Sequence, residues 1–186
     1  LEFYYKNYLQ YNGINLPKVA VLCEPLLMCM FEFQNNDQRI MNLSNGIYLA
    51  QEARYNSTGH YTAFSEGNTG IDAYNYIYEW ITTGNGRTWV CQIVTHNGVE
   101  TDVSLTPVIF SKAAIGLHAL YDTSYTQKMV DYLTSTMPTP AQGYMQGVDE
   151  NGRVVFTNAG AGNAVILEAA WYAIEQDNAP TPTPTP

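Results

Sequence analysis

The stretch that decides the fold covers residues 51–68 and reads Gln51-Glu52-Ala53-Arg54-Tyr55-Asn56-Ser57-Thr58-Gly59-His60-Tyr61-Thr62-Ala63-Phe64-Ser65-Glu66-Gly67-Asn68. It begins as the end of an amphipathic helix and continues into a polar loop that holds one carboxylate, Glu66. Aromatic residues follow closely at Tyr74, Tyr76, Tyr78 and Trp80. A sugar ring stacks on aromatic side chains, and acid–base cleavage of a glycosidic bond needs a carboxyl group. The stretch therefore indicates carbohydrate chemistry; the alternative is that the aromatic residues are core and Glu66 caps a helix.

The composition predicts one globular domain with a neutral, hydrogen-bonding surface. The chain has 186 residues, of which 46% are hydrophobic and 13% are charged, and this length is enough for one domain with a sizeable core. The formal net charge of −9 argues against a nucleic-acid partner, because binding to phosphates needs a basic face. We expect a neutral partner, a polysaccharide or an oligosaccharide.

Several features favour an extracellular or cell-surface location. The chain starts at Leu1 without Met, so we expect a processed product or a fragment. Two sequons predict glycosylation at Asn42 and Asn56. Residues 179–186 form a Thr-Pro repeat, which we expect to be an extended linker or tail after a domain at residues 1–178. The sequence contains no apolar run that predicts a membrane span.

The cysteines predict neither a metal site nor a redox site. Cys23 and Cys29 would point to different faces of one helix, so buried free thiols are expected; a bridge from Cys91 to one of them is the alternative. The sequence lacks the Cys and His spacing that is typical of zinc sites. We therefore expect no metal and no cofactor.

The spacing of apolar residues predicts a mainly α fold, in which antiparallel helix pairs are joined by long loops. Helices are expected at residues 1–9, 17–34, 37–54, 106–121, 124–136 and 162–175. Residues 73–82 fit a short helix, although their aromatic residues also suit a strand. Residues 88–95 and 97–103 predict a small β-hairpin, and another turn is expected at residues 149–152.

A series of short phrases occurs in one order along the chain. They are Glu24-Pro25-Leu26-Leu27, Arg54-Tyr55, Tyr61-Thr62-Ala63-Phe64-Ser65-Glu66, Tyr76-Ile77-Tyr78, Gly86-Arg87-Thr88-Trp89, residues 111–120, Gly143-Tyr144-Met145-Gln146-Gly147 and residues 163–168. In this order they resemble the C-terminal half of the prokaryotic family known as domain of unknown function 3131, and the resemblance extends to Tyr172. It implies an α/α toroid, half or incomplete here, like those of glucoamylase-like and β-glucanase-like enzymes.

The sequence departs from the family pattern in three places, and the first of them predicts an incomplete toroid. The N-terminal half is missing, Gly67 stands where a carboxylate often follows Ser-Glu, and Ala161-Gly162-Asn163 replaces an Asn-Thr-Asn phrase. Half a toroid would leave one side of its core open. We therefore expect a partner, which is either the missing N-terminal half or a neighbouring subunit.

The sharpest functional hypothesis is glycoside hydrolysis by paired carboxylates. It assigns Glu66 as the general acid and Glu24 as its partner, with Glu150 or Asp149 as alternatives. The residues predicted to bind the substrate are Tyr76, Tyr78, Trp80, Trp89 and Glu150. For Glu24 the alternative is a buried ion pair with Arg54 or Lys112. For Asp149 and Glu150 the alternative is a solvated turn.

A second function of another class stays open. The chain could be a non-catalytic glycan-binding or surface-assembly module that keeps the fold and has lost the chemistry. The missing half, the altered phrases and the Thr-Pro tail favour this alternative.

Overall fold

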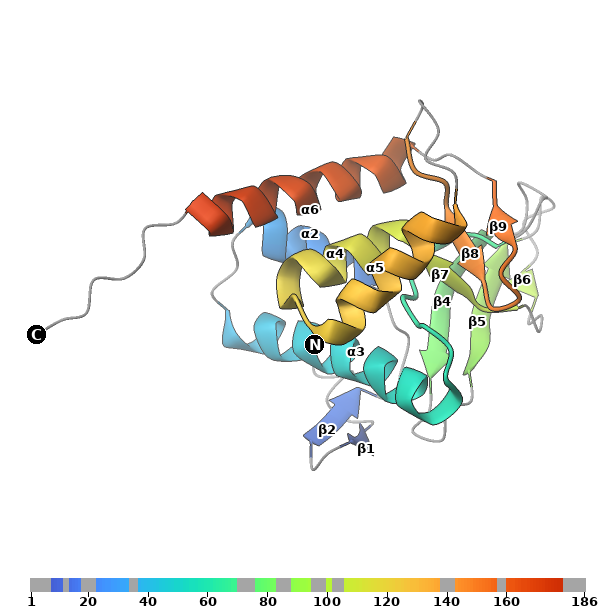
Figure 1. Ribbon diagram of the computed structural model, residues 1–186. Coiled ribbons are helices and arrows are strands. Elements are labelled where there is room, and N and C mark those ends of the chain that lie inside the picture. Colours follow the sequence, from blue (N-terminus) through green and yellow to red (C-terminus); the bar gives the residue numbers. More distant parts are fainter. Residues whose placement is uncertain are drawn as a thin grey trace, which may run out of the picture.

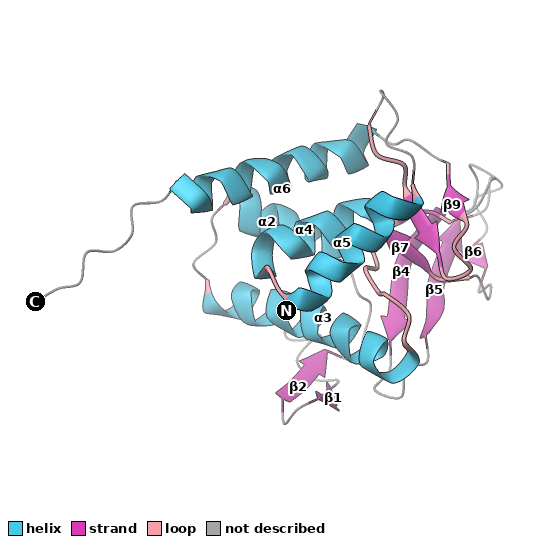
Figure 2. Ribbon diagram, viewed as in Figure 1, coloured by secondary structure: helices cyan, strands magenta, loops and turns pink. Residues whose placement is uncertain are grey.

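The computed structural model describes residues 8–11, 14–17, 23–33, 37–69, 76–82, 88–94, 100–101, 106–137, 143–156 and 160–178; for residues 8–11, 14–17, 78–82, 88–94 and 100–101 it describes the backbone only. Within these ranges the fold is mainly helical, as predicted, with small antiparallel sheets at its edges (Figure 1, Figure 2). The described helices are α2 (Cys23–Glu32), α3 (Gln38–Thr58), α4 (Ser111–Tyr121), α5 (Ser124–Thr136) and α6 (Gly160–Asn178).

Successive helices run in opposite directions. In Figure 1 the N-termini of α4 and α6 and the C-termini of α3 and α5 lie at the end of the helical layer that faces the sheets. Helix α4 is central, because it packs against α2, α5 and α6. The predicted antiparallel helix pairs are therefore present, and they direct several helix first turns to one end of the molecule.

The strands form three sheets. They are a hairpin of β1 (Tyr8–Tyr11) and β2 (Ile14–Pro17), a four-stranded sheet of β3 (Gly67–Asn68), β4 (Tyr76–Thr82), β5 (Thr88–Val94) and β6 (Glu100–Thr101), and a three-stranded sheet of β7 (Val108–Phe110), β8 (Gly147–Asp149) and β9 (Val154–Val155). In the last sheet Phe110 lies opposite Gly147. A Cβ atom on Gly147 would lie 2.0 Å from the carbonyl oxygen of Ile109, so only glycine allows β7 and β8 to approach this closely.

Two of the predicted helices are strands where the structure describes them, and the helix expected from residue 106 begins only at Ser111, after strand β7. Tyr8 and Leu9 lie in β1, and residues 76–82 form β4. Aromatic and β-branched residues suit strands, and pairing with β2 and β5 satisfies backbone groups that a short isolated helix would leave open. The helix expected from Pro17 instead begins at Cys23, which places Pro25 in the first turn, where its missing N–H is tolerated. Residues 1–7 and 73–75 lie outside the described residues.

Local capping sets both ends of α3. The Asp37 side chain accepts a hydrogen bond from the backbone N–H of Arg39 at 2.9 Å. At the other end Gly59 adopts a left-handed conformation with φ of 76° and donates its N–H to the carbonyl of Tyr55 at 2.7 Å. The chain leaves α3 at this glycine and enters the segment that leads to Glu66.

One apolar core fills the space between the helices and the three-stranded sheet. Its fully buried side chains include those of Leu27, Phe64, Phe110, Met129 and Leu133. Cys23 lies in this core and Cys29 is half-buried, and both thiols are free, as predicted. The side chain of Cys91 lies outside the described residues.

We expect the folded state to lose stability as pH rises from about 9 toward 12. Burial raises the pKa of the Cys23 thiol from 9.0 to about 12 and that of the Tyr121 hydroxyl from 10.0 to about 12. The unfolded chain releases these protons at the lower values, so their stabilising contribution is complete below pH 9 and is lost as pH rises through this interval. For Cys23 alone the loss should reach about 2 kcal/mol at pH 10.5.

Urea unfolding at pH 8 and pH 10.5 measures this loss, and Cys23→Ala is the matched control. The variant should be less stable at pH 8 but should lose less stability on going to pH 10.5. A free energy of unfolding that is equal at the two pH values would contradict the expectation.

Candidate functional site

A buried extended segment, residues 62–65, leads from α3 to Glu66. All four of its residues are 0% exposed. The Phe64 N–H donates to Oε1 of Gln51 at 2.5 Å, and Nε2 of the same Gln51 donates to the Cys23 thiol at 3.0 Å. One buried amide side chain of α3 therefore links the segment to the start of α2.

Residues of α3 and α5 hold the start of this segment at Thr62. The Tyr125 hydroxyl donates to the Thr62 carbonyl at 2.8 Å and accepts from the Thr62 N–H at 3.1 Å. Nη1 of Arg54 donates to the Thr62 hydroxyl at 2.9 Å, and its guanidinium carbon lies 5.1 Å from the centre of the Phe64 ring. Buried extended backbone needs such partners, and here they hold it in one conformation.

Glu66 is the half-buried residue at which this segment emerges. Among the residues that the structure describes, it forms neither an ion pair nor a hydrogen bond. Three other carboxylates of the predicted site, Glu24, Asp149 and Glu150, are each ion-paired. Glu66 is thus positioned by the anchored residues on either side of it, and no described residue pairs with its carboxylate.

Gly67 brings the chain that follows Glu66 against Gln146 and Phe110. Its φ is 150°, and a Cβ atom there would lie 1.9 Å from Nε2 of Gln146 and 2.7 Å from the Phe110 ring. A carboxylate side chain, which the family pattern often has at this position, would not fit this packing.

Replacing Gly67 by Ala is expected to destabilise the fold by about 2–4 kcal/mol, because backbone strain and overpacking add. Gly59→Ala is the matched control, since Gly59 also has a positive φ but has no atom within 4 Å of an added Cβ. It should cost about 1 kcal/mol, from strain alone. Urea unfolding measures the free energy of unfolding of the two variants. If both lose the same amount, the Gln146 side chain moves away from the added methyl group at no cost.

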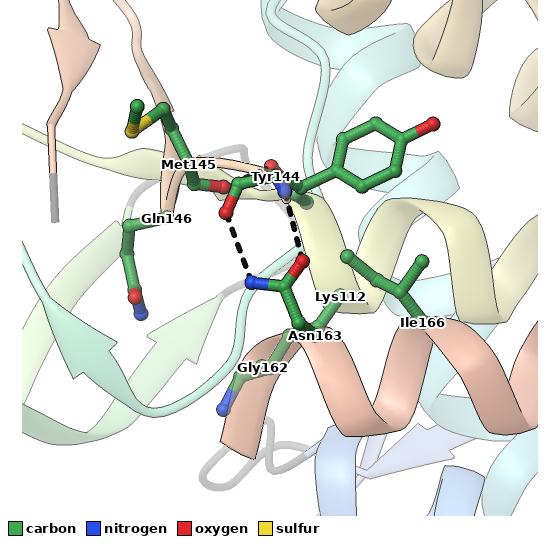
Figure 3. Close-up of a pocket in the computed structure, with 8 residues that line it drawn as sticks. Lys112, Tyr144, Met145, Gln146, Gly162, Asn163 and Ile166 are labelled. Atoms are coloured by element: carbon green, nitrogen blue, oxygen red, sulfur yellow. Dashed lines mark hydrogen bonds between the residues drawn. The ribbon is translucent and has the colours of Figure 1, made fainter. Parts of the chain in front are cut away.

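Gln146 also lines a small cavity at the first turns of α4 and α6 (Figure 3). Two hydrogen bonds fix one wall: Oδ1 of Asn163 accepts from the Tyr144 N–H at 2.8 Å, and Nδ2 donates to the Tyr144 carbonyl at 3.1 Å. The cavity is lined by Ser111, Lys112, Tyr144, Met145, Gln146, Gly162, Asn163 and Ile166. Its volume of about 10 Å³ is room for at most one water molecule, and not for a sugar ring.

Lys112 joins the first turns of three helices. Its Nζ donates to Oε2 of Glu24, and the two side chains are 7% and 16% exposed. Its stem lies 3.8 Å from where a Cβ atom of Gly162 would be. The alternative interpretation of Glu24, an ion pair with Lys112, is therefore confirmed. The pair leaves Glu24 at the same end of the molecule as the cavity, as a counter-ion to a buried ammonium group.

Glu150 and Asp149 are part of a turn, as predicted; Asn151 and Gly152 at its tip are exposed, but the alternative of a solvated turn is wrong for the two carboxylates. Nη2 of Arg54 donates to Oε1 of Glu150, and the side chains are 4% and 16% exposed. Asp149 is 2% exposed and accepts from the N–H and Nε of Arg153, at 2.8 and 3.0 Å. The turn folds back onto the buried guanidinium of Arg54, a contact between residues 96 positions apart that local sequence does not reveal.

The aromatic residues predicted to bind substrate belong to the four-stranded sheet. Tyr76, Tyr78 and Trp80 lie in β4 and Trp89 lies in β5, opposite Ile81. Strand β4 pairs with β3, so Tyr76 is directly opposite Asn68, two residues after Glu66. The sheet thus joins the strands that carry these aromatic residues to the chain that carries Glu66. The side chains of Tyr78, Trp80 and Trp89 lie outside the described residues.

A cluster of stacked tyrosines lies between α3 and α5 and was not predicted. The Tyr61 ring is 4.9 Å from that of Tyr55 and 5.4 Å from that of Tyr132, and Tyr48 stacks on Tyr121 at 4.4 Å. The repeated seven-residue spacing of Tyr48 with Tyr55 and of Tyr125 with Tyr132 is the signal that would have revealed it. Because these rings cover one another, they chiefly stabilise the contact between the two helices.

A second cavity of about 190 Å³ lies beside this cluster. It is lined by Gly59, His60, Tyr61, Ile109, Tyr132 and Glu150. Glu150 thus borders an open space while it neutralises Arg54.

The remaining predicted residues are the two glycosylation candidates on α3. Asn42 and Asn56 are exposed on α3, and Asn42 accepts a hydrogen bond from Gln38 at 2.8 Å; their glycosylation stays a prediction. Within the described ranges, no group of three His, Cys, Asp or Glu side chains is placed to hold a metal ion. None of the described helices has the length and apolar character needed to cross a membrane.

Comparison with known proteins adds one finding. A family model described as "protein of unknown function (DUF3131)" matches residues 7–176. No curated protein and no solved structure matches the chain.

Proposed function

Since the chain belongs to the DUF3131 family, which is described without a function, we propose from the geometry around Glu66 that it is a glycoside hydrolase-like protein that acts on a neutral polysaccharide. The observation that carries this proposal is the contrast between Glu66 and the other carboxylates of the site. Glu66 follows the anchored segment of residues 62–65 but forms no ion pair with a described residue, whereas Glu24 and Glu150 are paired with buried cations.

The contrast assigns different roles to the two catalytic carboxylates. A general acid must hold and deliver a proton, which suits a carboxyl group that is free of ion pairs and fixed in position. Glu66 meets both conditions. Glu24, beside the ammonium group of Lys112, suits the second carboxylate, which acts as a base or a nucleophile. A separation of about 5–5.5 Å between the carboxyl groups in the bound state would mean retention, and about 6.5–9.5 Å would mean inversion.

The four-stranded sheet supplies the proposed sugar platform. Its strands β4 and β5 carry Tyr76, Tyr78, Trp80 and Trp89, and β3 joins them to the Glu66 segment. Aromatic faces bind the apolar face of a sugar ring without any need for charge, in keeping with a surface poor in charged residues. We do not assign Glu150 to substrate binding, because it neutralises Arg54.

The helix arrangement supports a larger assembly around this site. Successive helices run antiparallel, and the first turns of α2, α4 and α6 meet at Lys112. Antiparallel helix pairs are also the units of an α/α toroid, and we propose that the chain forms part of one, outside the cell or on its surface. The small volume beside Lys112 means that a complete substrate cleft would need further residues from a partner.

A non-catalytic glycan-binding or surface-assembly module is the second candidate. The observation that favours it is that Glu24, Asp149 and Glu150 all serve ion pairs within the fold. In that case Glu66 would contact a glycan through hydrogen bonds and would not transfer a proton.

Incubation of the full chain with neutral α- and β-glucans, followed by chromatography of the products, tests the first candidate. Calorimetric titration with oligosaccharides of the same linkages tests the second. Release of shorter oligosaccharides supports a hydrolase, and binding without release supports the module. If the chain neither cleaves nor binds any of the glucans, both candidates are contradicted.

A further inference from the structure

Helix α6 is apolar on two opposite faces. Its inner face buries Val165, Ile166 and Ala169 against the core. Its outer face carries three large apolar side chains that are exposed: Leu167 at 71%, Trp171 at 62% and Ile174 at 53%. In Figure 1 α6 lies at the edge of the helical layer, with α2 and α4 on one side of it only.

The exposed residues form one continuous line, here called the α6 outer stripe (Leu167, Trp171 and Ile174). Their spacing of four and then three residues places them on a single side of the helix. Isolated exposed apolar residues are ordinary, but an aligned group marks an interaction site. A helix that is apolar on opposite faces is normally covered on both, and α6 does not have the character of a membrane span.

We propose that the α6 outer stripe binds an amphipathic helix of a partner protein, whose apolar face is flanked by Lys and Arg. The spacing of the stripe matches the seam along which two helices pack, which favours a helical partner over a strand. This inference rests on α6 alone and does not depend on the glycan chemistry of Glu66.

The charges on α6 decide the partner's chemistry. Glu168 and Glu175 are seven residues apart, each directly after a stripe residue, so they line the same flank of the stripe. Asp177 adds a third carboxylate, and the helix contains no Lys or Arg. A second copy of the chain would bring like charges together across the seam, and the net charge of −9 adds to this repulsion. A basic flank on the partner would instead pair with these carboxylates.

The test measures binding of a synthetic 21-residue peptide helix to the full chain by fluorescence anisotropy. The peptide carries Leu at the two seam positions of each heptad and Lys at both flanking positions. Leu167→Ser and Trp171→Ser should each weaken binding at least tenfold. Because both side chains are exposed, thermal unfolding followed by circular dichroism should show unchanged folding. Glu168→Gln combined with Glu175→Gln should weaken binding several-fold and reduce its dependence on salt.

Two controls separate docking on the stripe from general attraction of a basic peptide. A scrambled peptide of equal charge, without the Leu seam, should bind at least tenfold more weakly. Phe156→Ser, which removes an equally exposed apolar side chain outside α6, should leave binding unchanged. Equal binding of the scrambled peptide, or no effect of Leu167→Ser and Trp171→Ser, would overturn the proposal.

Sedimentation of the full chain alone tests the competing occupant. Sedimentation is expected to show a monomer. In a separate fluorescence measurement, the tryptophan emission should shift to shorter wavelength when the peptide binds. A dimer that dissociates on Leu167→Ser would show that a second copy covers the stripe, and the proposal of a basic partner would fall.

Discussion

Replacing Glu66 by Gln is expected to lower the turnover of a cleaved glucan by a factor of about 10² or more, the usual loss when a general acid is removed. The reason is that the amide keeps the shape of the side chain but has no acidic proton to transfer to the leaving oxygen. Stability should change little, because Glu66 forms no ion pair or hydrogen bond with any residue that the structure describes. Affinity for the glucan should also be retained, so the loss should appear in kcat and not in KM.

Initial rates at saturating glucan, together with a urea unfolding curve, measure both parts of this expectation. Asp131→Asn, at an exposed position on α5, is a matched control that removes a carboxylate elsewhere and should leave turnover unchanged. If Glu66→Gln unfolds the protein while the activity per folded molecule persists, Glu66 is structural and Glu24 becomes the leading candidate.

Replacing Glu150 by Ala is expected to destabilise the fold by about 3–5 kcal/mol, because it removes a charged partner from a buried cation. The Arg54 side chain is only 4% exposed, and two of its other contacts, with the Thr62 hydroxyl and the Phe64 ring, are to uncharged groups. The same change should weaken the anchoring of the segment that leads to Glu66, so turnover per folded molecule should also fall.

Two further variants isolate the contribution of the charge. Replacing Arg54 by Met together with Glu150 by Leu removes both charges and should restore part of the lost stability, since no unpaired ion remains. Arg39→Ala breaks an exposed ion pair with Asp37 and should be nearly silent. If Glu150→Ala unfolds at the same urea concentration as the unchanged chain, Arg54 does not need this partner.

The ion pairs show why the sequence alone predicted only part of the candidate site. The sequence identified Glu24, Glu66 and Glu150 as candidates, and Arg54 or Lys112 as the alternative partner of Glu24. It left open which charges meet, because the pairs join residues 88 and 96 positions apart. Only the packing of α2 against α4, and the return of the β8–β9 turn onto α3, pairs Glu24 and Glu150 with buried cations; no residue that the structure describes pairs with Glu66.

Local signals were sufficient for most of the helices, and insufficient for short aromatic segments. The Asp37 cap and the Thr123 capping box mark the starts of α3 and α5, because a side-chain oxygen satisfies backbone donors within the same turn. Residues 76–82 suited either helix or strand, and they form β4 because the partner strand β5 lies beside them. Hydrogen bonds between strands are non-local, so no window of a few residues contains them.

The sequence by itself determined the mainly α class, the helix caps, the turn at residues 149–152 and the polar loop that carries Glu66, since each depends on residues within one or two turns of one another. Tertiary structure alone decided the course of residues 62–65 through the core, the pairing of the charges and the exposure of one face of α6. The physical reason is that the environment of a side chain depends on which elements pack together. Both faces of α6 carry apolar residues, so the sequence does not show which face is covered. The face that carries Leu167, Trp171 and Ile174 is exposed to water because α2 and α4 pack against the other face.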